Sequence, residues 1–379
     1  MQKNILVRSI AALSGIVMLA SVAACGDNTA TTTDNSSSSD STSKSTPISG
    51  NFSGAGASSQ QAAVEAWIAG FQGTNPEAKI AYNPSGSGAG VQTFLTGATA
   101  WAGSDKALSD DEVTQSSDKA CANGTTAFDV PVYISPIAII FNLKGVSDAG
   151  KHINLDADTA AKIFDGKIVK WNDPAIADQN KDLKLPDTAI TVVHRSDKSG
   201  TTQNFVSYFK DVTPDNWTYD LSENWPNEVG QGAKGTSGVI STVKQADGTI
   251  SYADFSQGGD LGTVAVKVGD KYNEISAEAG SKVIGDSKQD DTVKGDNRIV
   301  IKINHATEAE GAYPIVLVSY DIVCPAYKDT KQAEFAKAWL TYVTSDEGQK
   351  AAQDAAGTAP LPSSLKSEIT KSIEAIKTK

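Results

Sequence analysis

Short apolar runs alternate with amphipathic segments from Asn51 to the C-terminus, and this alternation limits the possible folds more than any other feature. Apolar residues at the spacing of one helix face predict a helix over 59–72: Val64, Trp67, Ile68 and Phe71. The same reasoning predicts strands at Ala78–Tyr82, Ala189–His194, Thr249–Tyr252, Ile299–Ile303 and Tyr313–Val323, two strand pieces broken near Pro136 within Val130–Asn142, and helices around Val91, Phe205 and Phe335. The alternation indicates an α/β protein.

Composition narrows the possible functions. The chain has 379 residues, of which 39% are hydrophobic and 21% charged, so two or three globular domains with sizeable cores are expected. The formal net charge of −12 argues against a nucleic-acid partner, which requires a basic face. Three His and three Cys, scattered along the chain, predict neither a metal site nor a cofactor.

The N-terminus has the pattern of an export signal. Lys3 and Arg8 form a cationic start, and the uncharged, mostly apolar stretch Ser9–Ala24 follows. Residues 1–24 are therefore predicted to be a signal peptide. Because small residues precede Cys25, as in a bacterial lipobox, we expect Cys25 to be acylated and the exported protein to be anchored to the outer face of the cell membrane. The alternative is ordinary cleavage after Ala24, which leaves Cys25 as a free thiol.

The next segment, together with Cys25, is predicted to be a tether. Residues 26–50 are rich in Ser and Thr and contain almost no apolar side chain, so ordering them would release little free energy. A disordered tether over 25–50 would let a globular body move near the membrane surface.

Three Gly/Ser turns lie between an expected strand and an expected helix. We call Gly54–Ser59 the first turn, Gly86–Gly90 the second turn and Ser199–Thr202 the third turn. Glycine lets the backbone approach a ligand closely, and the first N–H groups of a helix bear partial positive charge. One such turn is commonly only a capped helix start, but three in one chain indicate a shared anion site.

Two charged residues adjoin these turns. Arg195 directly precedes the third turn and can hold a tetrahedral oxyanion through two parallel hydrogen bonds; the alternative is a surface ion pair with Asp197. Asp105 follows the second expected helix, and it is either a ligand or a turn residue.

Several segments resemble, in order across 51 to about 362, the phosphate-binding proteins of the high-affinity phosphate ABC importers. They are GAGASSQ (54–60), YNPSGSGAGV (82–91), GSDKALSDDE (103–112), KIVKWNDPAI (167–176), LPDTAITVVHRSDKSGTT (185–202) and GTISYADF (248–255). The resemblance implies a two-lobed periplasmic-binding-protein-like fold of type II, with mixed sheets flanked by helices. Inorganic phosphate would bind in the cleft between the lobes, and membrane permease subunits would receive it from a monomeric binding protein.

The resemblance also implies a ligand set. It comprises Ser58, Ser59, Ser87, Asp105, Arg195, Ser199, Gly200 and Thr201, with Asp197 orienting Arg195. Ser58 and Ser59 stand where the family often has Thr followed by Phe, so the hydroxyl is kept and a bulky pocket wall is not. No catalytic residue is expected.

Two chain crossings are expected to form the hinge, near Tyr133–Phe141 and Thr307–Tyr313. Lobe I would then comprise 51–136 and 311–379, and lobe II would comprise 137–310. Cys121 and Cys324 are expected to form a disulfide, because export places them in an oxidising compartment. The alternative is two unpaired buried thiols.

Two other functions compete with phosphate binding. One is binding of another oxyanion such as sulfate or molybdate, and Asp105 is the residue that favours phosphate over these ions. Orthophosphate carries a proton that a carboxylate can accept, and sulfate does not. The other is a serine hydrolase with Ser87 or Ser199 as nucleophile. That reading requires a His base, and the chain offers only His152, His194 and His305.

Overall fold

The computed structural model describes residues 47–147 and 151–378. The predicted signal peptide, Cys25 and the tether as far as residue 46 lie outside the described residues. The end of the predicted tether differs from expectation, because Ile48 donates its backbone N–H to Asn75 at 2.8 Å and the first strand begins at Gly50. Within the described ranges, no helix is long and apolar enough to cross a membrane.

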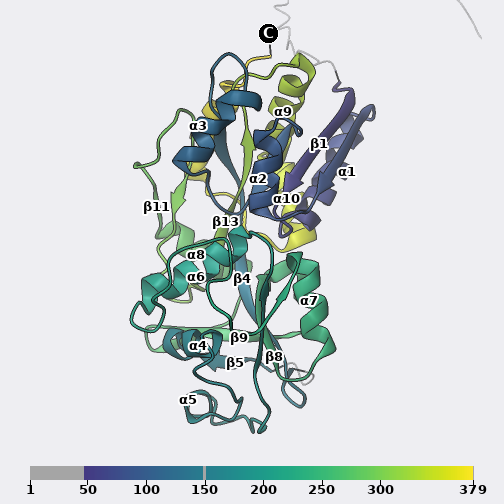
Figure 1. The fold of residues 1–379 in the computed structure, drawn as a ribbon. Coiled ribbons are helices and arrows are strands. Elements are labelled where there is room, and N and C mark those ends of the chain that lie inside the picture. The colour runs from purple at the N-terminus through teal and green to yellow at the C-terminus, as the bar shows by residue number, and fades with distance from the viewer. Residues whose placement is uncertain (1–46, 148–150, 379) are drawn as a thin grey trace, which may run out of the picture. The chain divides into compact units, whose positions relative to one another are not determined.

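The first part of the fold is built on three neighbouring strands, and we call it lobe I (Figure 1). Its strands are β1 (Gly50–Gly56), β2 (Ala78–Asn83) and β3 (Trp101–Ser104). Its helices are α1 (Gln61–Thr74), α2 (Ser87–Leu95), α3 (Asp110–Lys119), α9 (Thr330–Val343), α10 (Asp346–Ala356) and α11 (Lys366–Glu374), with a 3₁₀ turn η3 (Ser363–Leu365). β1 pairs in parallel with both β2 and β3, as the strand–helix–strand order predicts.

The second part, which we call lobe II, is built on β6, β7 and β8. Its strands are β5 (Ile153–Leu155), β6 (Thr191–Arg195), β7 (Gln231–Ala233), β8 (Thr249–Asp254), β9 (Gly262–Val268) and β10 (Lys271–Asn273). Its helices are α4 (Ala157–Phe164), α5 (Pro174–Ala177), α6 (Gly200–Val212), α7 (Gly235–Gln245) and α8 (Ala277–Gly285), with a 3₁₀ turn η2 (Phe255–Gln257). A short pair, β11 (Lys288–Gln289) and β12 (Ile301–Lys302), follows.

One long strand, β4 (Phe128–Asn142), runs from lobe I into lobe II, and β13 (Val316–Val323) pairs with β3 and with the lobe I half of β4. β4 pairs with β13 as far as Pro136 and with β8 from Ile137 onward, so its partner changes between these two residues. The prediction of two strand pieces broken near Pro136 was therefore wrong, because β4 is one strand from Phe128 to Asn142. The proline is accommodated within one continuous strand at the point where the ladder changes partner. The residue boundaries of the lobes stay a prediction.

Another expected element is shorter than predicted. The strand expected at Ile299–Ile303 is reduced to Ile301–Lys302, because its only ladder partner among the described residues is the two-residue β11. The helix expected over 59–72 runs instead from Gln61 to Thr74. Its predicted face is confirmed, since Val64, Trp67 and Phe71 are buried.

Aromatic side chains fill the core of lobe I. Trp67 and Trp101 each pack against Trp339 of α9, with ring centroids 6.3 and 5.3 Å apart. All three indoles are completely buried. This packing fixes α1 and α9 against the sheet and thereby sets the position of the turn that precedes α1.

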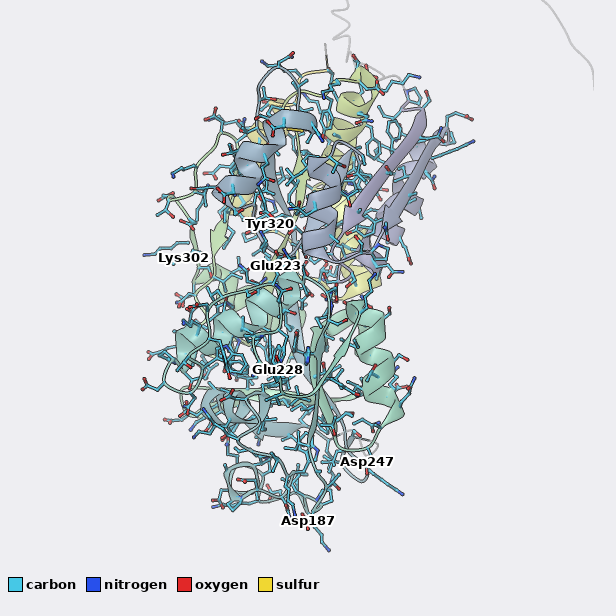
Figure 2. The ribbon with its side chains drawn as sticks, viewed as in Figure 1. Asp187, Glu223, Glu228, Asp247, Lys302 and Tyr320 are labelled. Carbon is cyan, nitrogen blue, oxygen red and sulfur yellow. A yellow bond between two sulfur atoms is a disulfide. The ribbon has the colours of Figure 1, made fainter. Side chains whose placement is uncertain are left out.

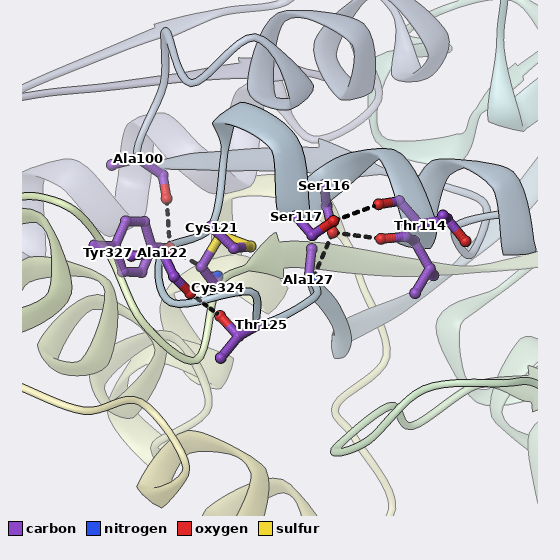
Figure 3. The surroundings of a disulfide bond; sticks show 11 residues. Ala100, Thr114, Ser116, Ser117, Cys121, Ala122, Thr125, Ala127, Cys324 and Tyr327 are labelled. Carbon is purple, nitrogen blue, oxygen red and sulfur yellow. Dashed lines mark hydrogen bonds between the residues drawn. A yellow bond between two sulfur atoms is a disulfide. The ribbon is translucent and has the colours of Figure 1, made fainter.

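The expected disulfide is present between Cys121, after α3, and Cys324, after β13 (Figure 3). Beside it, the Tyr327 hydroxyl donates to the carbonyl of Ala100 at 2.7 Å and accepts the N–H of Cys324 at 3.1 Å. The bridge spans 203 residues. Closing a loop of that length is worth about 5 kcal/mol in the chain-entropy description. It ties β13 to the first part of lobe I.

One buried carboxylate lies in the middle of β13. Asp321 is fully buried and accepts a hydrogen bond from the Trp339 indole at 2.9 Å. Burial raises the pKa of Asp321 to about 7, against the opposing effect of Trp339 and Gln60. The native state therefore holds a proton on Asp321 over a pH range in which the unfolded chain, at 3.8, has lost it.

Asp321→Asn should stabilise the protein increasingly as pH rises. The stability that the protonated Asp321 side chain contributes to the native state is fully present below about pH 4 and is lost as the pH rises through about 7. The stability contributed by an asparagine amide does not depend on pH in this range. Urea unfolding at pH 4.5, 6 and 8 measures the difference between variant and wild type. Asp187→Asn, at a side chain 64% exposed, serves as the control. A difference for Asp321→Asn that stays constant across the three pH values contradicts the argument.

Candidate functional site

Backbone hydrogen bonds bring the three turns together. Gly86 of the second turn donates to the carbonyl of Gly56 in the first turn at 2.8 Å. Gly88 donates to the carbonyl of Lys198, directly before the third turn, at 3.4 Å. The first turn leads into α1, and the second and third turns contain the N-caps and first residues of α2 and α6, so the N-termini of three helices from two lobes face one region. The convergence that the sequence predicted is therefore present in the structure.

Asp105 lies at the centre of this region. Its Oδ2 accepts hydrogen bonds from Ser59 at 2.5 Å and from Thr201 at 2.9 Å. Its Oδ1 accepts from Ser319 of β13 at 2.7 Å, and its backbone N–H donates to Ser87 at 3.2 Å. The carboxylate thus contacts the first turn and β13 on the lobe I side and α6 of lobe II.

The electrostatic state of Asp105 follows from these contacts. Its side chain is only 2% exposed, and burial raises its pKa. The hydroxyls of Ser59, Ser319 and Thr201 and the positive charge of Arg195 oppose that rise. Asp105 is therefore a desolvated acceptor held by short hydroxyl contacts, a group that readily accepts a proton from a ligand.

Arg195 and Asp197 form a bidentate ion pair beside the turns. Nε of Arg195 lies 2.7 Å from Oδ1 of Asp197, and Nη2 lies 2.6 Å from Oδ2. Asp197 takes two of the five guanidinium N–H donors and so fixes the plane of the fork. Asp197 also accepts the N–H of Gly235 at 3.0 Å. Although burial raises the pKa of Asp197, Arg195 and Gly235 hold it below its usual value.

The second turn requires glycine where it meets this ion pair. Gly86 has φ of +98°, and a Cβ there would lie 2.3 Å from Oδ2 of Asp197. Both the left-handed backbone and the close carboxylate exclude a larger residue. The absence of a side chain at Gly86 therefore lets the second turn lie directly against the Arg195–Asp197 ion pair.

The remaining predicted residues lie in the same region. Ser58 accepts the N–H of Thr236 at 3.0 Å. Ser199 caps α6 by accepting the N–H of Thr202 at 3.2 Å, so it fulfils the ordinary capping role as well. A Cβ on Gly200 would lie 2.9 Å from Ser87 Oγ, which shows how closely the second and third turns pack. No predicted site residue lies apart from the cluster among those described; their roles as ligands stay a prediction.

The arrangement offers donors for an anion rather than groups for covalent catalysis. Hydroxyls, helix N-terminal amides and one guanidinium surround a single carboxylate. The His ring nitrogens contact other partners, namely Thr263 and Glu274 for His152, the carbonyl of Arg195 for His194 and the carbonyl of Pro314 for His305. Within 47–147 and 151–378, no group of three or more His, Cys, Asp or Glu residues could hold a metal ion.

Comparison with known proteins identifies the family. The model of the PBP superfamily domain matches residues 41–347. Phosphate-binding protein PstS2 of Mycobacterium bovis is 35% identical over 329 residues, covering 85% of this chain and 86% of the relative. The chain belongs to the PstS family of phosphate-binding proteins. This is a family of substrate-binding proteins rather than enzymes, in agreement with the expected absence of catalytic residues.

Solved structures show that the fold is the two-lobed α/β fold of this family. The structure of a high-affinity periplasmic phosphate-binding protein (PfluDING) bound with phosphate has a TM-score of 0.67 and 21% identity, covering 85% of this chain and 93% of that one. A putative phosphate ABC transporter substrate-binding protein with bound phosphate from Clostridium perfringens has a TM-score of 0.57 and 19% identity, covering 83% and 100%. The predicted fold class is confirmed.

Sequence reasoning missed some residues of the cluster. Ser319 is a polar residue inside the long apolar run at Tyr313–Val323, and that contrast could have marked it. Thr236 lies in Gly235–Gly238, a fourth Gly/Ser segment, which forms the first turn of α7 shortly after β7. Gln257, which donates to the carbonyl of Ser58 at 3.1 Å, has no sequence signal of this kind.

Gly90→Ala should destabilise the protein by about 1–3 kcal/mol. A Cβ at this position would lie 2.2 Å from Cα of Gly56 and 2.5 Å from the carbonyl of Ala55, so it would push α2 away from the first turn. Gly73→Ala is the matched control, because Gly73 is also helical and its Cβ would meet nothing within 4 Å. The control should gain about 0.5–1 kcal/mol from helix propensity. Urea unfolding compares the two, and equal effects contradict the packing argument.

Proposed function

We propose that this protein captures inorganic phosphate between its lobes and delivers it to the membrane permease of an ABC importer. The observation that carries the proposal is the contact of one buried carboxylate, Asp105, with hydroxyls from both lobes and from β13. The names and titles of the relatives and similar structures, which describe phosphate-binding proteins, support it.

The proposed binding mode assigns the predicted ligands two tasks. The hydroxyls and amides of Ser58, Ser59, Ser87, Ser199, Gly200 and Thr201, with the guanidinium of Arg195, donate hydrogen bonds to the oxygens of the anion. Each hydrogen bond to a charged group contributes about 1.5–3 kcal/mol. Asp197 orients Arg195. Asp105 accepts the proton that orthophosphate retains near neutral pH.

Asp105 also argues against the competing oxyanions. Sulfate carries no proton at neutral pH, so its oxygens would face the carboxylate without a hydrogen bond between them. Sites that demand a specific hydrogen bond discriminate by about 10⁴–10⁵. In a sulfate- or molybdate-binding protein this buried carboxylate would repel the ligand without forming a hydrogen bond to it, and we therefore favour phosphate.

We further propose that the lobes close on phosphate by rotation about the strands that join them. Lobe I would comprise 51–136 and 311–379, and lobe II would comprise 137–310, with the hinge near Tyr133–Phe141 and Thr307–Tyr313. The change of partner along β4 between Pro136 and Ile137 supports the first crossing.

For cellular location, we propose export followed by lipid anchoring at Cys25 on the outer face of the bacterial cell membrane, with the protein acting as a monomer. Only the sequence of the first 50 residues supports the anchor. The tether would let the binding body reach the permease.

Equilibrium dialysis with radiolabelled phosphate, in competition with sulfate, tests the function and the role of Asp105 together. Wild-type protein should bind the labelled phosphate, and added sulfate should not displace it. Asp105→Asn should reduce the preference for phosphate over sulfate about tenfold or more. The amide N–H can donate a hydrogen bond to sulfate, whereas the uncharged amide oxygen is a weaker acceptor for the proton of phosphate than the carboxylate is.

The control is Asp187→Asn, at an exposed carboxylate near the lower end of lobe II in the view of Figure 2. It should leave the preference unchanged. Sulfate binding by wild type as tight as phosphate binding would overturn the function, and unaltered selectivity in Asp105→Asn would overturn the proton-reading role.

A further inference from the structure

Lys106 lies between two carboxylates that come from different lobes. It follows β3 of lobe I, and its Nζ is 2.8 Å from Oε2 of Glu112 at the start of α3. The same Nζ is 3.9 Å from Oε2 of Glu223, which belongs to the segment of lobe II between α6 and β7. The three side chains are only 11–14% exposed. This is an ion pair across the boundary between the lobes, directly next to Asp105.

The backbone and the side chain of Glu223 each lie against one of the three turns. Its main-chain carbonyl accepts the N–H of Ser199, in the third turn, at 3.0 Å. Its carboxylate leans over the second turn, since a Cβ on Gly88 would lie 3.1 Å from Oε1. Figure 2 shows Glu223 at mid-height, far from Asp187. Side chain and backbone of Glu223 thus contact turns from opposite lobes.

The charges around Glu223 make Lys106 its main stabilising partner. Oε1 of Glu223 is buried and has no hydrogen-bond partner among the described residues. Burial raises the pKa of Glu223; Lys106 and Lys198 lower it, while Glu112 and Asp105 raise it further. A carboxylate in this position depends on the Lys106 ammonium, which it shares with Glu112.

We propose that Lys106 and Glu223 form an electrostatic latch across the cleft, which holds the lobes together and prolongs the retention of bound phosphate. This inference rests on the proposed function. Lys106 and Glu223 would act as positioning residues, through the contacts of Glu223 with the second and third turns and not as ligands of the anion.

The latch should act on release more than on capture. Opening the cleft separates Lys106 from Glu223, so their attraction adds to the barrier that a bound ion must cross before it leaves. The pair carries no net charge, and removing both charges leaves the long-range field almost unchanged. The association rate should therefore change little while the release rate rises.

Stopped-flow measurement of phosphate release tests the latch in a double-mutant cycle. Lys106→Met and Glu223→Gln should each speed release about two- to fivefold, the range expected for one partly buried ion pair. The double variant should release no faster than the faster single variant, because either change alone breaks the pair. Lys106→Arg should keep release slow.

One control variant, and the fact that Glu223→Gln leaves the second ion pair of Lys106 in place, make every outcome decisive. Lys366→Met removes an exposed lobe I lysine paired with Asp346 at 3.0 Å and should leave release unchanged. Glu223→Gln leaves the Lys106–Glu112 pair intact, so it decides the question even if Lys106→Met fails to fold. Unchanged release in Glu223→Gln, or effects that multiply in the double variant, would overturn the latch. Failure of wild type to bind phosphate would instead overturn the proposed function.

Discussion

The packing of the three turns against one another depends on one buried carboxylate. Asp105 is almost inaccessible to solvent, and a carboxylate in that position is tolerated only where donors surround it. Hydroxyls arrive from Ser59, Thr201 and Ser319, on chain segments that lie far apart in sequence. Fold and site are therefore coupled, because the sheet, the strand β13 and the starts of α1 and α6 must all be in place before this carboxylate has its hydrogen-bond donors.

The same constraint explains how an acidic protein can hold an anion. Neutral hydroxyls, helix N-termini and the oriented Arg195 supply the favourable field locally, so the net charge of −12 is not decisive. Asp197 uses part of the guanidinium and fixes its plane, and Gly86 allows the second turn to reach that pair. In the proposed binding mode, Asp105 provides the selectivity for phosphate, and contacts between the lobes determine how long the ion is retained.

Much of this could be predicted from the sequence where the signal was local. The spacing of Val64, Trp67 and Phe71 predicted the buried face of α1, and the glycine turns predicted where helices begin. Contacts that depend on long-range pairing could not be predicted in the same way. The continuity of β4 through Pro136 depends on its two partner strands, and the approach of Glu223 to Lys106 depends on how the lobes meet. Neither leaves a periodic pattern in the sequence.

A crystal structure of the protein grown with phosphate shows whether the three turns and Asp105 share one anion site. We expect one tetrahedral ion between the lobes, within hydrogen-bond distance of Asp105, of Arg195 and of donors from all three turns. Phosphate density at another place, or in contact with only one lobe, would contradict it.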